Sequence, residues 1–244
     1  MQSFPILYED DHLLIINKQS GIAVQGGEGI FHSVDNLLSE QMNQKIYLVH
    51  RLDKDTAGIL VTAKDPQTAA EYTKLFAEKN ITKEYVAICT GCPSSSSGKI
   101  SDFIEQHGVK KEALTYYSTI KHTKKEIAGQ TYDFSMLKLS LGTGRMHQIR
   151  IHLQKTGTPI IADDKYGDFK INKLLKKEFG IKKLQLAAVK LTLPINGKPT
   201  AFEIPLPPHM QSAEQSLFVE IKISLKIKSP ATTYFPTVAA VSSA

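Results

Sequence analysis

The sequence predicts an α+β fold built on antiparallel strand pairs. Three observations indicate this class: short apolar stretches come in pairs joined by polar turns, helix signals fall at irregular intervals, and strands do not alternate regularly with helices. A doubly wound parallel sheet would show that regular alternation. The sequence contains no internal repeat.

The first half of the chain carries paired strand signals and two helix signals. Glu9, Asp10 and Asp11 form a polar turn between two apolar stretches, which predicts two short strands. Asp65 and Pro66 form a good helix start, with the aspartate as N-cap and the proline at the first helical position. In order, we expect strands within 5–18, a glycine-rich loop at 21–29, a helix at 33–44, strands at 46–50 and 59–64, and a helix at 65–78.

The second half contains a further antiparallel pair and two helices. The polar stretch 121–130 is expected to join the two strands of the pair. The helix at 145–156 would carry Met146, Ile149 and Leu153 on one face. In order, we expect strands at 83–91, 113–120 and 131–141, helices at 145–156 and 169–179, and strands at 183–194 and 200–204.

The character of the sequence changes after Pro208. Residues 218–228 alternate strictly between apolar and polar side chains, which predicts a strand, and the stretch that follows is typical of a loose tail. We therefore expect one main domain over residues 1–216 and a C-terminal extension over residues 217–244.

Composition excludes several classes of protein. The 244 residues include 41% hydrophobic and 22% charged side chains, as in an ordinary globular protein. No apolar run approaches the roughly 18 residues that span a bilayer, and the N-terminus lacks the basic start and apolar core of a signal peptide. We therefore expect a cytoplasmic protein that makes no membrane contact.

Charge and cysteine usage restrict the function further. The net charge of +6 fits a polyanionic partner, and eight lysines gather between residues 165 and 190 against two acidic residues. This basic stretch is either a solvated helix face or a nucleic-acid contact. Cys89 and Cys92 form a lone C-x-x-C, and without a second ligand pair we expect no structural zinc site. We expect no redox pair either, because Pro93 and four serines follow the motif where a redox pair would normally stand at a strand-to-helix turn.

The segment HRLDKDTAG (50–58) places two carboxylates in a polar loop between two predicted strands. Asp53 and Asp55 together could supply the acid and the base of a glycosidase-type reaction. Residues two apart in an extended segment point to opposite faces, so both would not easily flank one bond. A loop aspartate is also commonly a cap or a turn former, and the residues alone leave these alternatives open.

A second segment, GTGRMHQIRIH (142–152), places a glycine-rich turn before the basic start of a helix. Helix N-termini attract anions, and arginine binds phosphate or carboxylate through two parallel hydrogen bonds. A well-capped basic surface helix is the alternative. His147 and His152 are five residues apart instead of four, so a metal site on one helical face is rejected.

Together these segments resemble the RluA-type family of pseudouridine synthases. The family's H-R-L-D-x-x-T-S-G motif is matched by HRLDKDTAG, in which Asp53 occupies the place of the nucleophile. The resemblance covers roughly residues 5–210, with the motifs in the family's order. The other matches are Lys18 for the lysine of K-P-x-G, 83–87 for K-x-Y-x-A, 143–150 for T-G-R-x-H-Q-I-R, and 159–167 for P-I-x-G-D-x-x-Y-G.

The sequence departs from the family's pattern at four positions. None of the four alters Asp53, Tyr85 or Arg150, so the departures concern the shape of the RNA-binding loops and not the reaction. They are Gln19 for the proline of K-P-x-G, Ala57 for the serine of T-S-G, Ala162 for the glycine of G-D, and Ala187 for the histidine of an L-H-A element.

The resemblance implies the pseudouridine synthase fold, which is a mixed, largely antiparallel sheet with flanking helices and a central RNA-binding cleft. It also implies that the protein isomerises uridine in RNA. Asp53 would be the carboxylate that acts as nucleophile at the ribose, or as the base that begins an elimination there. Arg150 would pair with Asp53 and lower its pKa. Tyr85 would stack on the uracil, and Leu186 would form an apolar floor.

The resemblance further implies how RNA is bound. The target uridine must be flipped out of the stack, with Arg51, Arg145 and the 165–190 lysines as candidates for gripping the flanking phosphates. No cofactor or metal is expected, because the isomerisation involves neither net redox change nor transfer of a group to another molecule. We expect the partner to be a ribosomal or transfer RNA stem-loop. Because Lys18 already belongs to the first motif, we expect no separate N-terminal RNA-binding domain. We also expect a monomer.

Two other functions are considered beside this one. A nucleoside hydrolase that used Asp53 and Asp55 would release free uracil. An RNA-binding protein without catalytic activity would share the fold, but it would have no need of a carboxylate among phosphates. Retention of Asp53, Tyr85 and Arg150 therefore favours an enzyme.

Overall fold

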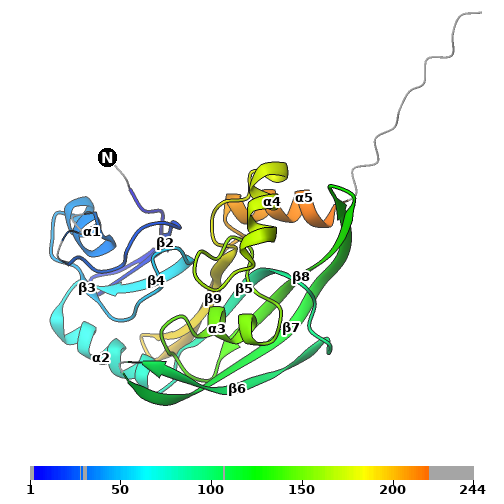
Figure 1. Ribbon diagram of the computed structural model, residues 1–244. Helices are drawn as coiled ribbons and strands as arrows, with labels where there is room; N and C mark the ends of the chain where they lie inside the picture. Colours follow the sequence, from blue (N-terminus) through cyan, green and yellow to red (C-terminus); the bar gives the residue numbers. More distant parts are fainter. Residues whose placement is uncertain (1–2, 28, 30–31, 107, 220–244) are drawn as a thin grey trace, which may run out of the picture.

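The computed structural model describes residues 3–27, 29, 32–106 and 108–219 (Figure 1). Its strands form one open sheet in the order β1-β2-β4-β9-β5-β8-β7-β6, with β10 beside β9 and β3 beside β4. The elements are β1 (Ile6–Glu9), β2 (Leu13–Lys18), α1 (Val34–Met42), β3 (Tyr47–Leu48), β4 (Ala57–Ala63), α2 (Pro66–Ala77), β5 (Thr82–Thr90), β6 (Ser97–Gln106), β7 (Val109–Ile127), β8 (Gln130–Leu141), α3 (Gln148–Lys155), α4 (Phe169–Phe179), β9 (Leu186–Ile195), β10 (Lys198–Glu203) and α5 (Pro208–Phe218).

The sheet is mixed and largely antiparallel, as the family resemblance implied. Every described strand pairing is antiparallel except that of β4 with β9, which consists of the two pairs Ala57–Ala187 and Gly58–Ala188. At Gly58 the strands approach so closely that an added Cβ atom would lie 2.1 Å from the carbonyl oxygen of Ala188. Because φ there is +117°, only glycine fits this position.

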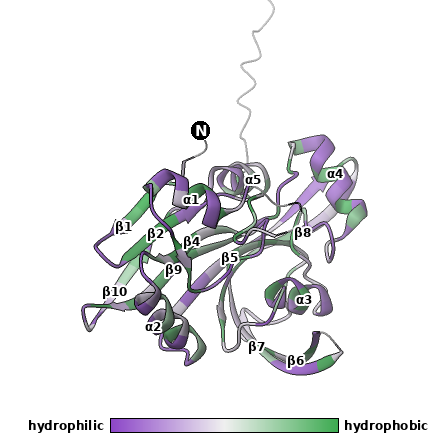
Figure 2. Cartoon of the chain, turned by 90° about the vertical axis from the view of Figure 1, so that its left-hand side faces the viewer, coloured by the Kyte–Doolittle hydropathy of each residue, from purple (hydrophilic) through white to green (hydrophobic). Residues whose placement is uncertain are grey.

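Alternating side chains of β5 divide the core between the two faces of the sheet. Tyr85 and Ala87 pack in a cluster with Ile149 of α3, whereas Val86 and Ile88 pack with residues of α4 and α5. A third cluster lies beneath α2, against β4 and β9. Figure 2 shows β1, β2 and β4 as mainly hydrophobic, whereas much of α1 and α4 is hydrophilic. Because one cluster contains a residue of α3 and the other contains residues of α4 and α5, helices flank both faces of the sheet.

Several expected elements have different bounds. The stretch 121–130 is not a polar linker, because β7 and β8 run through most of it. The strands reverse at Ala128 and Gly129, which both have positive φ (51° and 79°), as a two-residue hairpin turn requires. The stretch is polar because its side chains are mostly exposed. Of the strand expected at 46–50, only Tyr47–Leu48 forms, and α3 begins at Gln148 instead of 145. Met146 accordingly lies outside α3 and is 52% exposed.

The C-terminal region differs from the expectation at two points. Phe218 ends α5, so it belongs to a helix and not to the strand expected at 218–228, of which the rest beyond Val219 lies outside the described residues. Leu217 of α5 is buried against the core, so α5 crosses the boundary expected at residue 216. Within the described residues, no helix has the length and apolar character needed to cross a membrane.

Candidate active site

A cavity of about 640 Å³ opens between the loop that precedes β4 and the N-terminal end of α3. All six residues singled out from the sequence line it: Asp53, Tyr85, Arg150, Arg51, Arg145 and Leu186. Asp53 is the only carboxylate among the described residues of its lining, and Asp55 is not among them. The structure therefore places one carboxylate among the described lining residues of the cavity, not the two that the acid and base of a glycosidase would need.

A buried lysine holds the loop that carries Asp53. Lys18 is fully buried at the end of β2, and its ammonium group donates to the carbonyl oxygens of Gln19 (3.1 Å), Lys54 (2.8 Å) and Thr56 (2.8 Å). Burial lowers its pKa to about 8, although the charges of Asp55 and Asp53 oppose this shift. Since two of the three acceptors follow Asp53 within three residues, Lys18 fixes the backbone of the loop beside the carboxylate.

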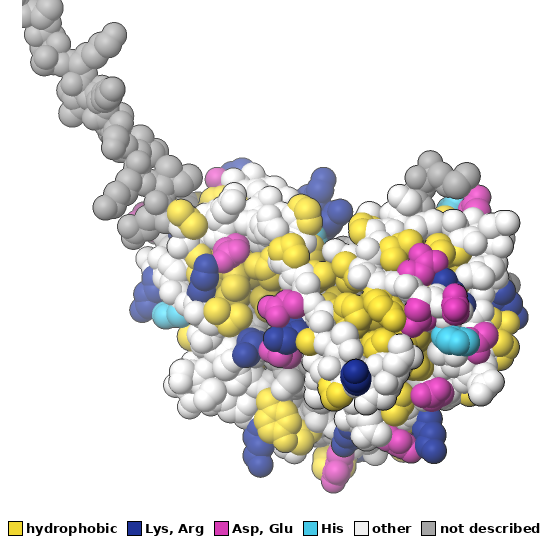
Figure 3. Space-filling view, turned by 180° about the vertical axis from the view of Figure 1, so that it is seen from behind, with side chains coloured by type: hydrophobic (Ala, Val, Ile, Leu, Met, Phe, Trp, Pro, Cys, Tyr) yellow, Lys and Arg dark blue, Asp and Glu magenta, His cyan; other side chains and the backbone are white. Residues whose placement is uncertain are grey.

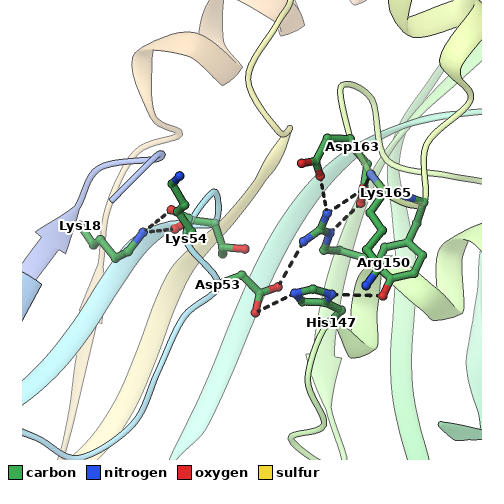
Figure 4. A network of polar contacts seen from close by, with 10 residues as sticks. Lys18, Asp53, Lys54, His147, Arg150, Asp163 and Lys165 are labelled. Carbon is green, nitrogen blue, oxygen red and sulfur yellow. Dashed lines mark hydrogen bonds and ion pairs between the residues drawn. The ribbon is translucent and has the colours of Figure 1, made fainter. Parts of the chain in front are cut away.

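Arg150 is bound mainly by acids other than Asp53. Its Nε and Nη2 atoms each donate to the carboxylate of buried Asp163 at 2.7 Å, and Nη2 also reaches Asp164 at 2.9 Å. Nη1 remains on the side of Asp53, 3.9 Å from Oδ2. Burial alone would lower the pKa of Arg150, but hydrogen bonding and charge from Asp163 raise it, so the guanidinium stays charged. Arg150 thus presents one fixed corner to Asp53 (Figure 4).

The carboxylate of Asp53 points between Arg150 and His147 (Figure 4). Its Oδ1 atom lies 4.0 Å from Nε2 of His147. Burial raises the pKa of Asp53, and the attraction of His147, Arg150 and Lys18 does not fully offset it. The charge of Arg150 lowers this pKa, as we expected, but desolvation by burial outweighs it, so the net shift is upward.

Tyr85 and Leu186 reach the cavity through the pairing of the central strands. Ala188 of β9 pairs with Gly58 on one side and with Tyr85 on the other, so these three residues stand in one row across the sheet. Tyr85 and Leu186 are both buried. Burial and the charge of Asp53 raise the pKa of Tyr85, which keeps its hydroxyl protonated. The ring therefore offers a neutral, fixed surface beside the carboxylate.

Two lysines add positive charge to the cavity and were not singled out from the sequence. Lys54 and Lys83 line it together with Arg51 and Arg145. Burial lowers the pKa of Lys83 to about 8, and its Nζ atom lies 4.8 Å from the centre of the Phe76 ring. None of the lysines between 165 and 190 is among the described lining residues. On the face seen in Figure 3, lysine and arginine side chains are interspersed with acidic ones, so no continuous basic track covers it.

His147, Asp163 and Tyr166 also lie at this site, although no role was expected for them from the sequence. His147 lies in the segment matched to T-G-R-x-H-Q-I-R, and the other two are the fixed aspartate and tyrosine of P-I-x-G-D-x-x-Y-G. Their membership in these motifs was the available signal. The described residues contain no group of three or more histidine, cysteine, aspartate or glutamate side chains placed to hold a metal ion.

Comparisons with known proteins agree with this geometry. Residues 12–155 match the family model of RNA pseudouridylate synthases. Ribosomal large subunit pseudouridine synthase C of Rickettsia typhi is 35% identical over 218 residues, which cover 83% of this chain and 68% of that protein. The protein of the same name from Escherichia coli (strain K12) is 34% identical over 221 residues, covering 87% of this chain and 69% of its own.

Solved structures support the fold. Human RNA Pseudouridylate Synthase Domain Containing 4 superimposes with a TM-score of 0.68 at 24% identity, covering 88% of this chain and 94% of that one. Human RNA Pseudouridylate Synthase Domain Containing 1 gives the same TM-score and identity over 83% of each chain. Fold, family match and cavity together define an RNA-modifying isomerase. The chain belongs to the RNA pseudouridylate synthase family, and its activity is that of an RNA pseudouridine synthase.

Proposed function

We propose that this synthase isomerises a uridine of ribosomal RNA, with Asp53 as the group that begins the reaction at the ribose. The observation that supports this most directly is that Asp53 is the sole carboxylate among the described residues of the cavity lining. Isomerisation breaks the C1′–N1 bond and rejoins the uracil through C5. Asp53 can serve it either by bonding to the sugar or by removing a ribose proton.

The remaining lining residues suit a uracil that must be held while it turns. The ring of Tyr85 is buried and neutral beside Asp53, and Leu186 supplies an apolar contact. Stacking of a base on an aromatic ring is worth about 1–3 kcal/mol, which would keep the freed uracil from escaping. The cavity volume of about 640 Å³ falls within the range of small-molecule sites, so a nucleotide flipped out of the stack would fit.

Ribosomal RNA is the substrate class that the relatives favour. Both bacterial relatives described above carry the name of a ribosomal large subunit pseudouridine synthase. The cationic lining residues Arg51, Lys54, Lys83 and Arg145 would meet the phosphates on either side of the flipped uridine. Transfer RNA offers the same chemistry, and the assay below compares the two.

The test is tritium release from 5-tritiated uridine in ribosomal and transfer RNA isolated from a strain that lacks the protein. Asp53→Asn should abolish release, because the reacting carboxylate is lost. RNA binding should be retained, because the change removes a negative charge near the phosphates. Asp55→Asn is the matched control. It removes the same charge only two residues from Asp53, but the side chain of Asp55 does not line the cavity. Near-normal release by Asp53→Asn would refute the assignment, and release from transfer RNA alone would refute the substrate class.

A further inference from the structure

His147 has an unusual backbone conformation at the edge of the cavity. It precedes the first residue of α3 with φ 54° and ψ 21°, in the left-handed region, and its side chain makes no hydrogen bond that caps the helix. Residues other than glycine adopt this conformation rarely, and those that do are concentrated at functional sites. The His147 side chain is therefore not used to cap the helix, and its ring lines the cavity.

The imidazole of His147 is held between a tyrosine and the carboxylate. Its Nδ1 atom lies 3.1 Å from the hydroxyl oxygen of Tyr166, and the two rings meet edge to face with centroids 5.6 Å apart. Its Nε2 atom faces Oδ1 of Asp53 at 4.0 Å, whereas Arg150 faces Oδ2 (Figure 4). Each carboxylate oxygen is therefore approached by a different side chain.

These contacts decide which imidazole nitrogen carries the proton. An ionised carboxylate facing Nε2 favours the form with a proton there, because a lone pair at that position would be repelled. Nδ1 is then an acceptor, and the Tyr166 hydroxyl donates to it. Burial lowers the pKa of His147 and outweighs the attraction of Asp53, so the ring is a neutral donor near pH 7.

We propose that His147, held by Tyr166, is a positioning residue that fixes the orientation of the Asp53 carboxylate through its Nε2–H. This role rests on the proposed function of Asp53. The 4.0 Å separation exceeds hydrogen-bond length in the free enzyme, and such contacts commonly tighten when the substrate is bound. Arg150 faces Oδ2 and His147 faces Oδ1, so tightening of both contacts would hold the carboxylate plane in one orientation toward the ribose.

Two amide variants test separately the roles of the Nε2 and Nδ1 atoms of His147. The side-chain amide introduced by His147→Gln reaches about as far as Nε2, whereas the amide introduced by His147→Asn reaches only as far as Nδ1. Asparagine also tolerates the left-handed backbone, so His147→Asn should fold normally. We expect His147→Asn to lower kcat about 100-fold with KM changed less than about twofold, as for a small misplacement of a reacting group. His147→Gln should recover at least about tenfold of that loss.

The pH profile supplies a readout that a purely structural role would not change. Because a donor to the ionised carboxylate is removed, the acid limb of the kcat profile should move to higher pH in His147→Asn and, to a smaller extent, in Tyr166→Phe. The double variant should be no worse than His147→Asn alone, since both act through one contact chain. The charged and titratable groups facing this chain are Asp53, Arg150, Asp163, Lys165 and Lys18, and all stay unchanged in these variants.

The outcomes separate this inference from the assignment of Asp53. If Asp53→Asn is inactive but His147→Asn keeps wild-type kcat and acid limb, only the positioning role is overturned. Equal losses in the Asn and Gln variants with an unmoved acid limb would also overturn it. An active Asp53→Asn would remove the proposed function itself. Thermal unfolding of each variant, with an unchanged midpoint, shows that a loss of kcat does not come from unfolding.

Discussion

Asp163 holds Arg150 through two hydrogen bonds of 2.7 Å, which leaves only the Nη1 corner of the guanidinium toward Asp53. The acid that fixes the arginine and the acid that we propose to react are therefore different residues. Asp163 also accepts backbone N–H groups of Lys165 and Tyr166, so it anchors the loop that follows it.

Removal of Asp163 should lower the stability of the fold. Its side chain is fully buried, so Asp163→Ala leaves the guanidinium without its main partner and should lower the free energy of unfolding by about 3–5 kcal/mol. Asp164→Ala is the control, because that side chain is 80% exposed and should change stability by less than about 1 kcal/mol. Urea unfolding measures the free energy of unfolding of both variants. Equal effects of the two variants would contradict the distinction drawn here.

The pH dependence of activity should reflect the raised pKa of Asp53. In the proposed reaction Asp53 acts as the carboxylate, so we expect activity to be lost as pH falls through its pKa, and a raised pKa moves this loss above the ordinary 3.8. The kcat/KM profile of the wild-type enzyme, taken over the range in which the fold is intact by circular dichroism, measures the acid limb. An acid limb at or below the ordinary aspartate value would contradict the dominance of burial.

Lys83 should contribute one phosphate contact. Lys83→Met should weaken RNA binding and reduce the slope of log K against log salt by about 1, whereas Lys198→Met, at the exposed start of β10 and outside the cavity, should leave the slope unchanged. Because burial lowers the pKa of Lys83 to about 8, wild-type affinity should also fall as pH rises through that value. Retention of this fall in Lys83→Met would assign it to another group. Fluorescence anisotropy with labelled RNA measures each quantity.

Two substitutions at Tyr85 should separate stacking from proton transfer. Tyr85→Ala should remove most of the activity, because base stacking of about 1–3 kcal/mol is lost. Tyr85→Phe keeps the ring and should retain much more of it. Tritium release under single-turnover conditions measures both variants. If the phenylalanine variant were as inactive as the alanine variant, the hydroxyl would have a chemical role.

Ala162 occupies a position where the family's motif has glycine, and its backbone has φ 58°. The left-handed conformation of alanine is strained by about 1–2 kcal/mol, and replacement by glycine relieves this strain. Glycine also raises the entropy of the unfolded chain, which offsets about 0.4–1 kcal/mol of the gain. Ala162→Gly should therefore raise the free energy of unfolding by roughly 0.5–1 kcal/mol. Ala70→Gly, in the exposed middle of α2, should lower it by about 1 kcal/mol. A loss of stability in both variants would show that Ala162 is not strained.

Local signals in the sequence were sufficient for the elements that depend on local chemistry. The helix at 169–179 has the expected bounds, and Asp65 caps α2 by accepting the N–H of Thr68 at 2.8 Å. The six expected site residues share one cavity because their motifs lie on adjoining segments of the sheet and of α3. Their individual roles remain predictions.

The features that could not be predicted from the sequence depend on contacts between distant parts of the chain. β6 is mostly exposed and shows no regular apolar alternation, so nothing in residues 97–106 signals a strand before β7 is beside it. In the same way, Arg150 has nearby candidates of equal charge, and only the folded loop shows that Asp163 binds it bidentately. The net direction of the Asp53 pKa also depends on burial, which no short motif reveals.

The order of the strands sets a condition on how this enzyme matures during translation. β4 and β5 follow one another in the chain with only α2 between them, yet β9 lies between them in the sheet. A nascent chain that has not yet emerged as far as Ala188 contains Asp53 and Tyr85 but lacks the strand that joins their segments. Because such non-local pairings form late, the cavity that holds Asp53 and Tyr85 is completed only after β9 has emerged from the ribosome.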